Sequence, residues 1–318
     1  MPADVRTAIL IAAYNGEATL ERAVRSALAQ PEAAEICIVD DASSDGTLAV
    51  ARTLAARQAR VSVLAFDANA GPGAARNAAI AATRAPWLAV LDADDYLIEG
   101  RLAALHAAAG EADFIADALI RVAPGAAASL RPAPLAVEPL DFTTFVLGNL
   151  GVGPLDLGFM KPMMRRSFLD AGGLRYQPEM RLGEDYDLYA RALALGARFL
   201  VSGPAGYVSV ERPGSLSKDH SEADLQRLRD CDDAIASVRS FTPAERGALR
   251  RHRASVDCRL QWRRLITAVK QRDAGAALAT FRSADAAFYL AGKLLEQAWL
   301  RATGRGPART PLSTSAAH

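Results

Sequence analysis

The chain has 318 residues, of which 51% are hydrophobic and 23% are charged, and its formal net charge is +1. This composition supports a sizeable core and argues against wholesale disorder, while the near-neutral charge argues against a nucleic-acid-binding protein that relies on overall charge. The three cysteines form no CxxC pair, which argues against a zinc site or a disulfide framework and favours a reducing compartment. No run of about eighteen uncharged apolar residues and no signal-cleavage pattern occurs, so we expect a cytoplasmic protein without a spanning helix.

Strand and helix patterns alternate through the first part of the chain. Short continuous apolar runs, typical of strands covered on both faces, occur at residues 7–14, 35–41, 61–66 and 87–95. Helical patterns separate these runs at residues 18–29, 43–58 and 71–83. Such alternation predicts a largely parallel sheet with right-handed crossovers.

Acidic residues stand at the carboxyl ends of two of these predicted strands. Asp40 and Asp41 follow one apolar run, and Asp92, Asp94 and Asp95 follow another. Ligands of parallel α/β sheets bind beyond the carboxyl ends of the strands. Three carboxylates so close together repel one another unless a cation, a solvated turn or a ligand offsets the repulsion. The group at 92–95 is therefore either an acidic turn or part of a ligand site.

The second half of the chain changes pattern. Residues 122–139 are rich in Pro, Gly and Ala, and residues 148–159 are rich in Gly, which predicts irregular connections. The stretch GEDYDLYARALALG, residues 183–196, predicts a helix with acids in its first turn and a glycine at its end.

From about Glu222 onward the pattern is helical, as far as Ala302. Thr242–Glu245 form a capping box that opens a helix carrying basic residues from Arg250 to Lys270. Its basic face is either simply solvated or a contact for anionic lipid or a phosphate-bearing acceptor. Residues 306–318 are typical of a disordered tail.

Six stretches occur in a fixed order, most of them at predicted strand ends or helix starts. They read IAAYNGEATLERAVRSAL, IVDDASSDGT, NAGPGAARNAAI, VLDADD, GEDYDLYARAL and ERPGSLSK. Each motif is weak by itself, but the ordered set resembles the family 2 glycosyltransferases over residues 5–220. Members of this family are inverting enzymes of the GT-A fold that build polysaccharides, glycolipids and related glycans from nucleotide-activated sugars.

The resemblance implies an α/β fold of the GT-A type: a doubly wound, mostly parallel sheet with flanking helices, here with a C-terminal helical extension. Residues 1–220 would form the glycosyltransferase domain, with a nucleotide-binding half at 1–100 and an acceptor half at 101–220. Residues 221–305 would form the helical region. The implied reaction moves a sugar from a UDP-sugar to a hydroxyl of a glycan or lipid-linked acceptor. The chain has no QxxRW motif of processive synthases, which favours transfer of one sugar per encounter.

The resemblance assigns five residues to the donor. The ring of Tyr14 would face the pyrimidine base, and Asp41, together with Asp40, would accept a hydrogen bond from a base N–H. Arg76 would pair with the base or the diphosphate, because a guanidinium suits phosphate geometry, and Asp92 would bind the ribose. The alternative roles are an ordinary strand-end tyrosine for Tyr14 and helix capping for Asp40 and Asp41.

The diphosphate leaving group requires positive charge. By the resemblance, Asp94, with Asp95 close enough to contribute, would bind Mg²⁺ or Mn²⁺, ions that need only one or two protein carboxylates beside phosphate oxygens. Arg212 and Ser215 in the stretch ERPGSLSK would donate to the diphosphate from a late loop.

Inverting transfer also needs a base that deprotonates the acceptor hydroxyl. The resemblance assigns this role to Asp185, with Glu184 beside it to bind the acceptor or to orient the base. The positive end of the predicted helix favours ionised acids in its first turn. Acids selected only for that helix end are the alternative reading.

Three other functions are alternatives to sugar transfer. A sugar nucleotidylyltransferase would carry a Gly-rich loop with Arg and Lys after the first strand, where this chain has AAYNGEATLE. An NAD-dependent dehydrogenase would need GxGxxG at the same place. A catalytically inactive relative that binds a sugar nucleotide would still carry the motifs, and only turnover distinguishes it from an enzyme.

Overall fold

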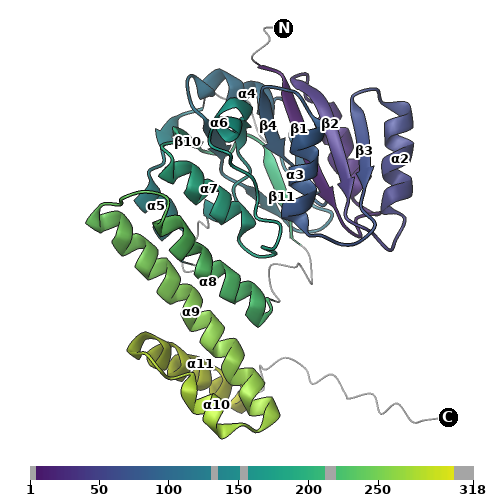
Figure 1. Ribbon diagram of the computed structural model, residues 1–318. Coiled ribbons are helices and arrows are strands. Elements are labelled where there is room, and N and C mark those ends of the chain that lie inside the picture. The colour runs from purple at the N-terminus through teal and green to yellow at the C-terminus, as the bar shows by residue number, and fades with distance from the viewer. Residues whose placement is uncertain (1–4, 130–134, 151–156, 212–219, 304–318) are drawn as a thin grey trace, which may run out of the picture. The chain divides into compact units, whose positions relative to one another are not determined.

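The computed structural model describes residues 5–129, 135–150, 157–211 and 220–303. It has the α/β architecture with C-terminal helices that the sequence predicts (Figure 1). The chain divides into two compact units, Met1–Arg253 and Ala254–His318.

An eight-stranded sheet lies at the centre of the first unit, with the strand order β3-β2-β1-β4-β9-β6-β10-β8. Most of its strands run parallel, whereas β9 is antiparallel to β4 and β6, and β8 is antiparallel to β10. The strand bounds are β1 Thr7–Ala13, β2 Ala33–Asp40, β3 Val61–Ala65, β4 Trp87–Val90, β6 Phe114–Asp117, β8 Val137–Pro139, β9 Met163–Arg165 and β10 Phe199–Ser202.

Helices cover both faces of this sheet, because its strands are apolar on both sides. Ile9 and Ile11 of β1 belong to a buried cluster with side chains of α1 (Leu20–Leu28), α2 (Thr47–Arg57) and α4 (Arg101–Ala109). The alternate residues of β1 are also buried, and α3 (Pro72–Ala82) contacts β1 and β2 without joining that cluster. The arrangement is doubly wound, as expected.

A second, three-stranded sheet has the order β5-β11-β7. Its strands are β5 Tyr96–Leu97, β7 Ile120–Val122 and β11 Tyr207–Val210. The remaining elements between β8 and β11 are α5 (Phe142–Leu147), the short 3₁₀ helix η2 (Leu157–Phe159), α6 (Arg166–Ala171) and α7 (Glu184–Ala194).

Two helices after the predicted domain boundary at residue 220 lie wholly or partly in the first unit. These are α8 (Glu222–Ala236) and the beginning of α9 (Pro243–Gln271). The hydroxyl of Tyr186 on α7 donates to Asp232 on α8 (2.7 Å), and Asp232 also lies 2.7 Å from His252 Nδ1 on α9. The compact unit therefore extends past residue 220. The predicted capping box is confirmed, since Thr242 and Glu245 exchange hydrogen bonds at the start of α9.

The second unit contains the rest of α9, α10 (Ala274–Ala279) and α11 (Ala284–Ala302). Among the residues described, no helix is both long enough and apolar enough to cross a bilayer. The predicted tail at 306–318 lies outside the described residues.

Candidate functional site

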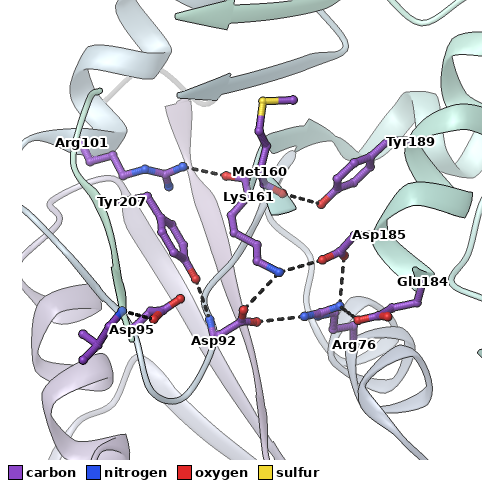
Figure 2. Close-up of polar contacts among 11 residues, drawn as sticks. Arg76, Asp92, Asp95, Arg101, Met160, Lys161, Glu184, Asp185, Tyr189 and Tyr207 are labelled. Carbon is purple, nitrogen blue, oxygen red and sulfur yellow. Dashed lines mark hydrogen bonds and ion pairs between the residues drawn. The ribbon is translucent and has the colours of Figure 1, made fainter. Parts of the chain in front are cut away.

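Charged side chains from four separate segments meet beyond the carboxyl end of β4 (Figure 2). We call Arg76, Asp92, Lys161, Glu184 and Asp185 the charge cluster. Arg76 donates hydrogen bonds to Asp92 Oδ1 (2.9 Å), Glu184 Oε1 (2.9 Å) and Asp185 Oδ1 (3.0 Å). Lys161 Nζ donates to Asp185 Oδ2 (2.7 Å) and lies 3.1 Å from Asp92 Oδ2. The cluster thus joins α3, the β4 end, the segment before β9 and the start of α7.

Two glycines allow the helices of the cluster to begin where they do. Gly71, with φ of +92°, precedes Pro72, the first residue of α3, so that Arg76 follows one turn later. Gly183, with φ of +72°, precedes Glu184 and Asp185 at the start of α7. A Cβ at Gly183 would also lie 2.5 Å from a methyl carbon of Leu228 on α8, so both conformation and packing favour glycine there.

Burial and ion pairing together set the charges in the cluster. Burial by itself would raise the pKa of Asp92, but the Lys161 ammonium and the Arg76 guanidinium lower it to about 2. Burial would lower the pKa of Lys161, but Asp185 and Asp92 raise it above its ordinary value, so the ammonium persists at working pH. Burial and the charge of Asp185 raise the pKa of Glu184. Glu184 therefore takes up a proton more readily than a free glutamate does.

A fully buried ion pair holds the backbone around the cluster. Arg101 donates to Asp117 Oδ1 (2.6 and 3.0 Å) and to the carbonyl of Lys161 (2.7 Å). The other oxygen of Asp117 accepts the backbone N–H groups of residues 205–207 at 3.0–3.1 Å. Tyr207 in turn accepts a hydrogen bond from the backbone N–H of Asp92 (3.1 Å) on its hydroxyl. One buried pair thereby fixes the backbone of Lys161 and the start of β11, whose Tyr207 holds Asp92.

The three acids after β4 have different surroundings. Asp92 belongs to the charge cluster, whereas the backbone carbonyl of Asp94 accepts a hydrogen bond from Arg22 (2.5 Å) and its side chain is partly exposed. Asp95 is buried, and its Oδ1 accepts the backbone N–H of Val210 in β11 (2.9 Å). Burial and the charge of Asp92 raise the pKa of Asp95 to about 7. Asp95 thus helps to hold the small sheet.

The acids after β2 are held by backbone groups. Asp41 accepts the N–H groups of Ala70 (2.7 Å) and Gly71 (2.8 Å), one on each carboxylate oxygen. Asp40 Oδ2 accepts the N–H of Ser43 (3.1 Å), and its buried Oδ1 has no hydrogen-bond partner among the described residues. Tyr14 is 48% exposed at the end of β1.

The structure brings four of the predicted residues, Arg76, Asp92, Glu184 and Asp185, into one cluster. The predicted diphosphate ligands Arg212 and Ser215 lie outside the described residues. Lys161 was missed by sequence reasoning. The available signal was a single charge within an otherwise apolar stretch, GFMKPMM, directly after a Gly-rich segment.

Comparison with known proteins identifies the family behind this geometry. Residues 8–172 match the family described as "Glycosyl transferase family 2". The chain is 45% identical over 283 residues to the succinoglycan biosynthesis protein ExoU of Rhizobium meliloti, covering 87% of this chain and 82% of that protein. It is 40% identical over 240 residues to ExoO of the same organism, covering 73% of this chain and 66% of that protein.

Solved structures share the fold at lower identity. Staphylococcus aureus TarS 1-349 superposes with a TM-score of 0.59 at 16% identity, over 86% of this chain and 90% of TarS. The mannosyltransferase PcManGT of Pyrobaculum calidifontis, in complex with GDP-Man and Mn²⁺, gives 0.57 at 17% identity, over 94% of this chain and 84% of that one. The fold is therefore that of the GT-A glycosyltransferases. With the family match and the ExoU and ExoO relatives, the chain is a transferase enzyme that belongs to glycosyltransferase family 2.

Proposed function

We propose that this enzyme transfers a sugar, with inversion at the anomeric carbon, from a UDP-sugar to a hydroxyl of a glycan or lipid-linked acceptor. The observation that carries the proposal is the charge cluster. In this cluster the proposed base, Asp185 at the start of α7, and the proposed ribose ligand, Asp92, pair with the same two cations. These cations are Arg76 and Lys161. Base and donor site are then neighbours, as direct attack on the anomeric carbon requires.

On the donor side, Tyr14 stacks on the base, and Asp41 or Asp40 accepts the base N–H. Asp40 supports this role because its buried Oδ1 has no partner among the described residues. Arg76 pairs with the negatively charged diphosphate. The uridine donor is proposed because TarS 1-349 is also described in complex with UDP-GlcNAc, and the GDP-Man complex of PcManGT supplies the alternative guanosine donor.

The residues present fit a divalent cation held mainly by the donor. Within the described ranges, no three His, Cys, Asp or Glu side chains gather as a metal site. Mg²⁺ and Mn²⁺ nevertheless need only one or two protein carboxylates when phosphates and water supply the rest. Asp94 is the partly exposed candidate, and Asp95 could add only the oxygen that does not accept from Val210. When bound, the ion would offset the negative charge that develops on the leaving diphosphate.

Calorimetry with UDP tests the donor site. UDP should bind more weakly by about tenfold or more when Mn²⁺ is removed or when Asp94 is replaced by Asn, because the cation would offset the charge of the diphosphate. Asp67→Asn, which removes an exposed acid between β3 and α3, is the matched control and should bind UDP like the wild type. Equal affinity with and without chelator would overturn the metal assignment.

The stereochemistry of the product tests inversion. An α-linked UDP-sugar should give a β-linked product, which the coupling constant of the anomeric proton in the NMR spectrum reports. A product that retains the α configuration would remove Asp185 from the role of inverting base.

Peripheral contact with the cytoplasmic face of an anionic membrane is the last part of the proposal. Residues 254–303 hold eight Lys or Arg and four Asp or Glu, a net charge of +4. On α11, Phe288, Leu295 and Trp299 share one face by their spacing and are 81%, 71% and 55% exposed. Aromatic and apolar side chains beside basic residues are typical of helices that lie in a membrane interface.

Vesicle co-sedimentation tests the contact. The wild type should sediment with phosphatidylglycerol vesicles at low salt and less at moderate salt, and not with phosphatidylcholine vesicles, because charge attraction is screened by salt. The triple change of Phe288, Leu295 and Trp299 to Ser should abolish sedimentation. Equal sedimentation of variant and wild type would show that the exposed face of α11 does not make the membrane contact.

A further inference from the structure

Lys161 is a buried lysine among apolar neighbours. Its side chain is 7% exposed, and Met160, Met163 and Met164, close to it in the sequence, are buried as well. Removing an ammonium from water costs several kcal/mol unless ion pairs offset the cost, so a lysine here must be closely paired. Its pairs are the Oδ2 atoms of Asp185 (2.7 Å) and Asp92 (3.1 Å).

Arg76 contacts the opposite oxygens of the same two carboxylates. It donates to Asp185 Oδ1 (3.0 Å) and Asp92 Oδ1 (2.9 Å). Two cations and two carboxylates therefore alternate in a closed ring, visible in Figure 2. Rotation of the Asp185 carboxylate about its Cβ–Cγ bond would break its contacts with both Arg76 and Lys161. Each carboxylate oxygen has two lone-pair sites, and Arg76 and Lys161 each occupy one site on a different oxygen of Asp185.

The backbone of Lys161 is held from two directions. Arg101, in the buried pair with Asp117, donates to the Lys161 carbonyl (2.7 Å). The hydroxyl of Tyr189 donates to the preceding carbonyl, that of Met160 (3.2 Å). Tyr189 lies one turn beyond Asp185 on α7, so the helix that carries the proposed base also holds the peptide that presents Lys161.

We propose that Lys161 is a positioning residue for sugar transfer, which fixes the carboxylate plane of Asp185 and its separation from Asp92. The inference rests on the proposed role of Asp185 as base. A small misplacement of a reacting group can cost about a hundredfold in rate, which is the loss expected when one side of the ring is removed.

The test is a double-mutant cycle of Lys161→Met and Asp185→Asn. Turnover is measured as the rate of UDP release. The donor is the one that reacts fastest among UDP-glucose, UDP-galactose and UDP-N-acetylglucosamine, and the acceptor is a glycolipid extract of polysaccharide-producing cells. Lys161→Met should lower kcat by about a hundredfold while UDP affinity by calorimetry changes only a few-fold. In the Asp185→Asn background the same change should have almost no further effect, because residues that act as a unit are not additive.

Arg191→Met is the matched control. Arg191 is also a largely buried cation that pairs with an acid of α7, Asp187. It should lower thermal stability without the loss in kcat. If Lys161→Met does not fold, Lys161→Gln keeps an N–H donor and replaces it in the cycle.

Other results would overturn the inference. Wild-type kcat in Lys161→Met, equal losses in both backgrounds, or a fall in UDP affinity as large as the fall in kcat would each do so. A wild-type chain that releases no UDP from any donor or acceptor offered would instead count against the proposed function, before any variant is compared.

Discussion

Asp41 and Asp185 are both buried acids at the carboxyl edge of the sheet, yet they are held in different ways. Asp41 accepts backbone N–H groups from the neighbouring loop at Ala70 and Gly71. Asp185 is held by the side chains of Arg76 and Lys161, which come from two distant segments.

The two kinds of contact have different consequences for the rest of the molecule. Backbone donors are placed by the loop itself, so the contacts of Asp41 fix the start of α3 beside the proposed donor site. Side-chain ion pairs connect α3, the segment after β4, the segment before β9 and α7, so the loss of one member changes the charge and position of the others. We therefore expect substitutions of Asp41 to act on stability and donor binding, and substitutions in the charge cluster to act on the transfer step.

The largest effect is expected from Asp185→Asn. The change preserves size and one of the two oxygens that accept from Arg76 and Lys161, but it removes the proton acceptor, so transfer should fall by about a hundred- to ten-thousand-fold. Affinity for UDP should change by at most a few-fold, because the donor contacts are assigned to other residues, Tyr14, Asp41, Arg76, Asp92 and Asp94. The measurement is the initial rate of transfer, with UDP affinity by calorimetry.

Two variants sharpen this prediction. Glu184→Gln should cost less if Glu184 only orients the acceptor or the base. Asp187→Asn, two residues along α7 and in a largely buried pair with Arg191, is the matched control and should keep the rate within a few-fold of wild type while it lowers thermal stability. Near wild-type transfer by Asp185→Asn would move the base elsewhere, and lost UDP affinity would make Asp185 a structural residue.

Sequence reasoning predicts the first half of the fold well for a physical reason. The strands β1 to β4 and the helices between them are each encoded by a local pattern, either a continuous apolar run or a helical period. The strand β9 has only three residues, Met163–Arg165, and carries no period of its own. Its place between β4 and β6 depends on long-range pairing, which no local pattern reports. The same holds for the packing of α8 onto α7.

The candidate site divides in the same way. Arg76, Asp92, Glu184 and Asp185 stand in the short motifs that carry the family resemblance. Lys161 stands in no such motif, and only the fold brings it to Asp92 and Asp185. Asp95 is the converse case, because its motif suggests a metal ligand while the pairing of β11 with β5 places the N–H of Val210 against it.

A smaller effect is expected from Asp41→Asn. The amide can accept from only one of Ala70 and Gly71, so one N–H before α3 loses its partner, at a cost of about 1–3 kcal/mol if it is the buried N–H of Gly71 and less if it is that of Ala70. Thermal unfolding should show this loss, and UDP affinity should fall moderately because the start of α3 carries Arg76. The exposed Asp67→Asn serves as the control. If Asp41→Asn lowered the transfer rate without changing stability or UDP affinity, the contrast between the two acids would be wrong.

The smallest effect concerns the pH dependence of stability. Asp92 has a folded-state pKa of about 2, against the ordinary 3.8, because Lys161 and Arg76 outweigh the effect of burial. A lowered folded-state pKa means stability that is present above about pH 4 and is lost as the pH falls toward 2. Because the Asp92 side chain is 32% exposed, solvent reduces the contribution to at most about 2 kcal/mol.

Urea unfolding at a series of pH values should therefore show a shallower fall in stability between pH 4 and 2 for Asp92→Asn than for the wild type. Glu245→Gln is the control, because the pKa of Glu245 is also lowered to about 2. Its lowering comes from hydrogen bonds with Arg239 and Thr242 at the start of α9, away from the charge cluster. Parallel curves for Asp92→Asn and the wild type would mean that the cations of the charge cluster do not stabilise the ionised Asp92 in the folded protein.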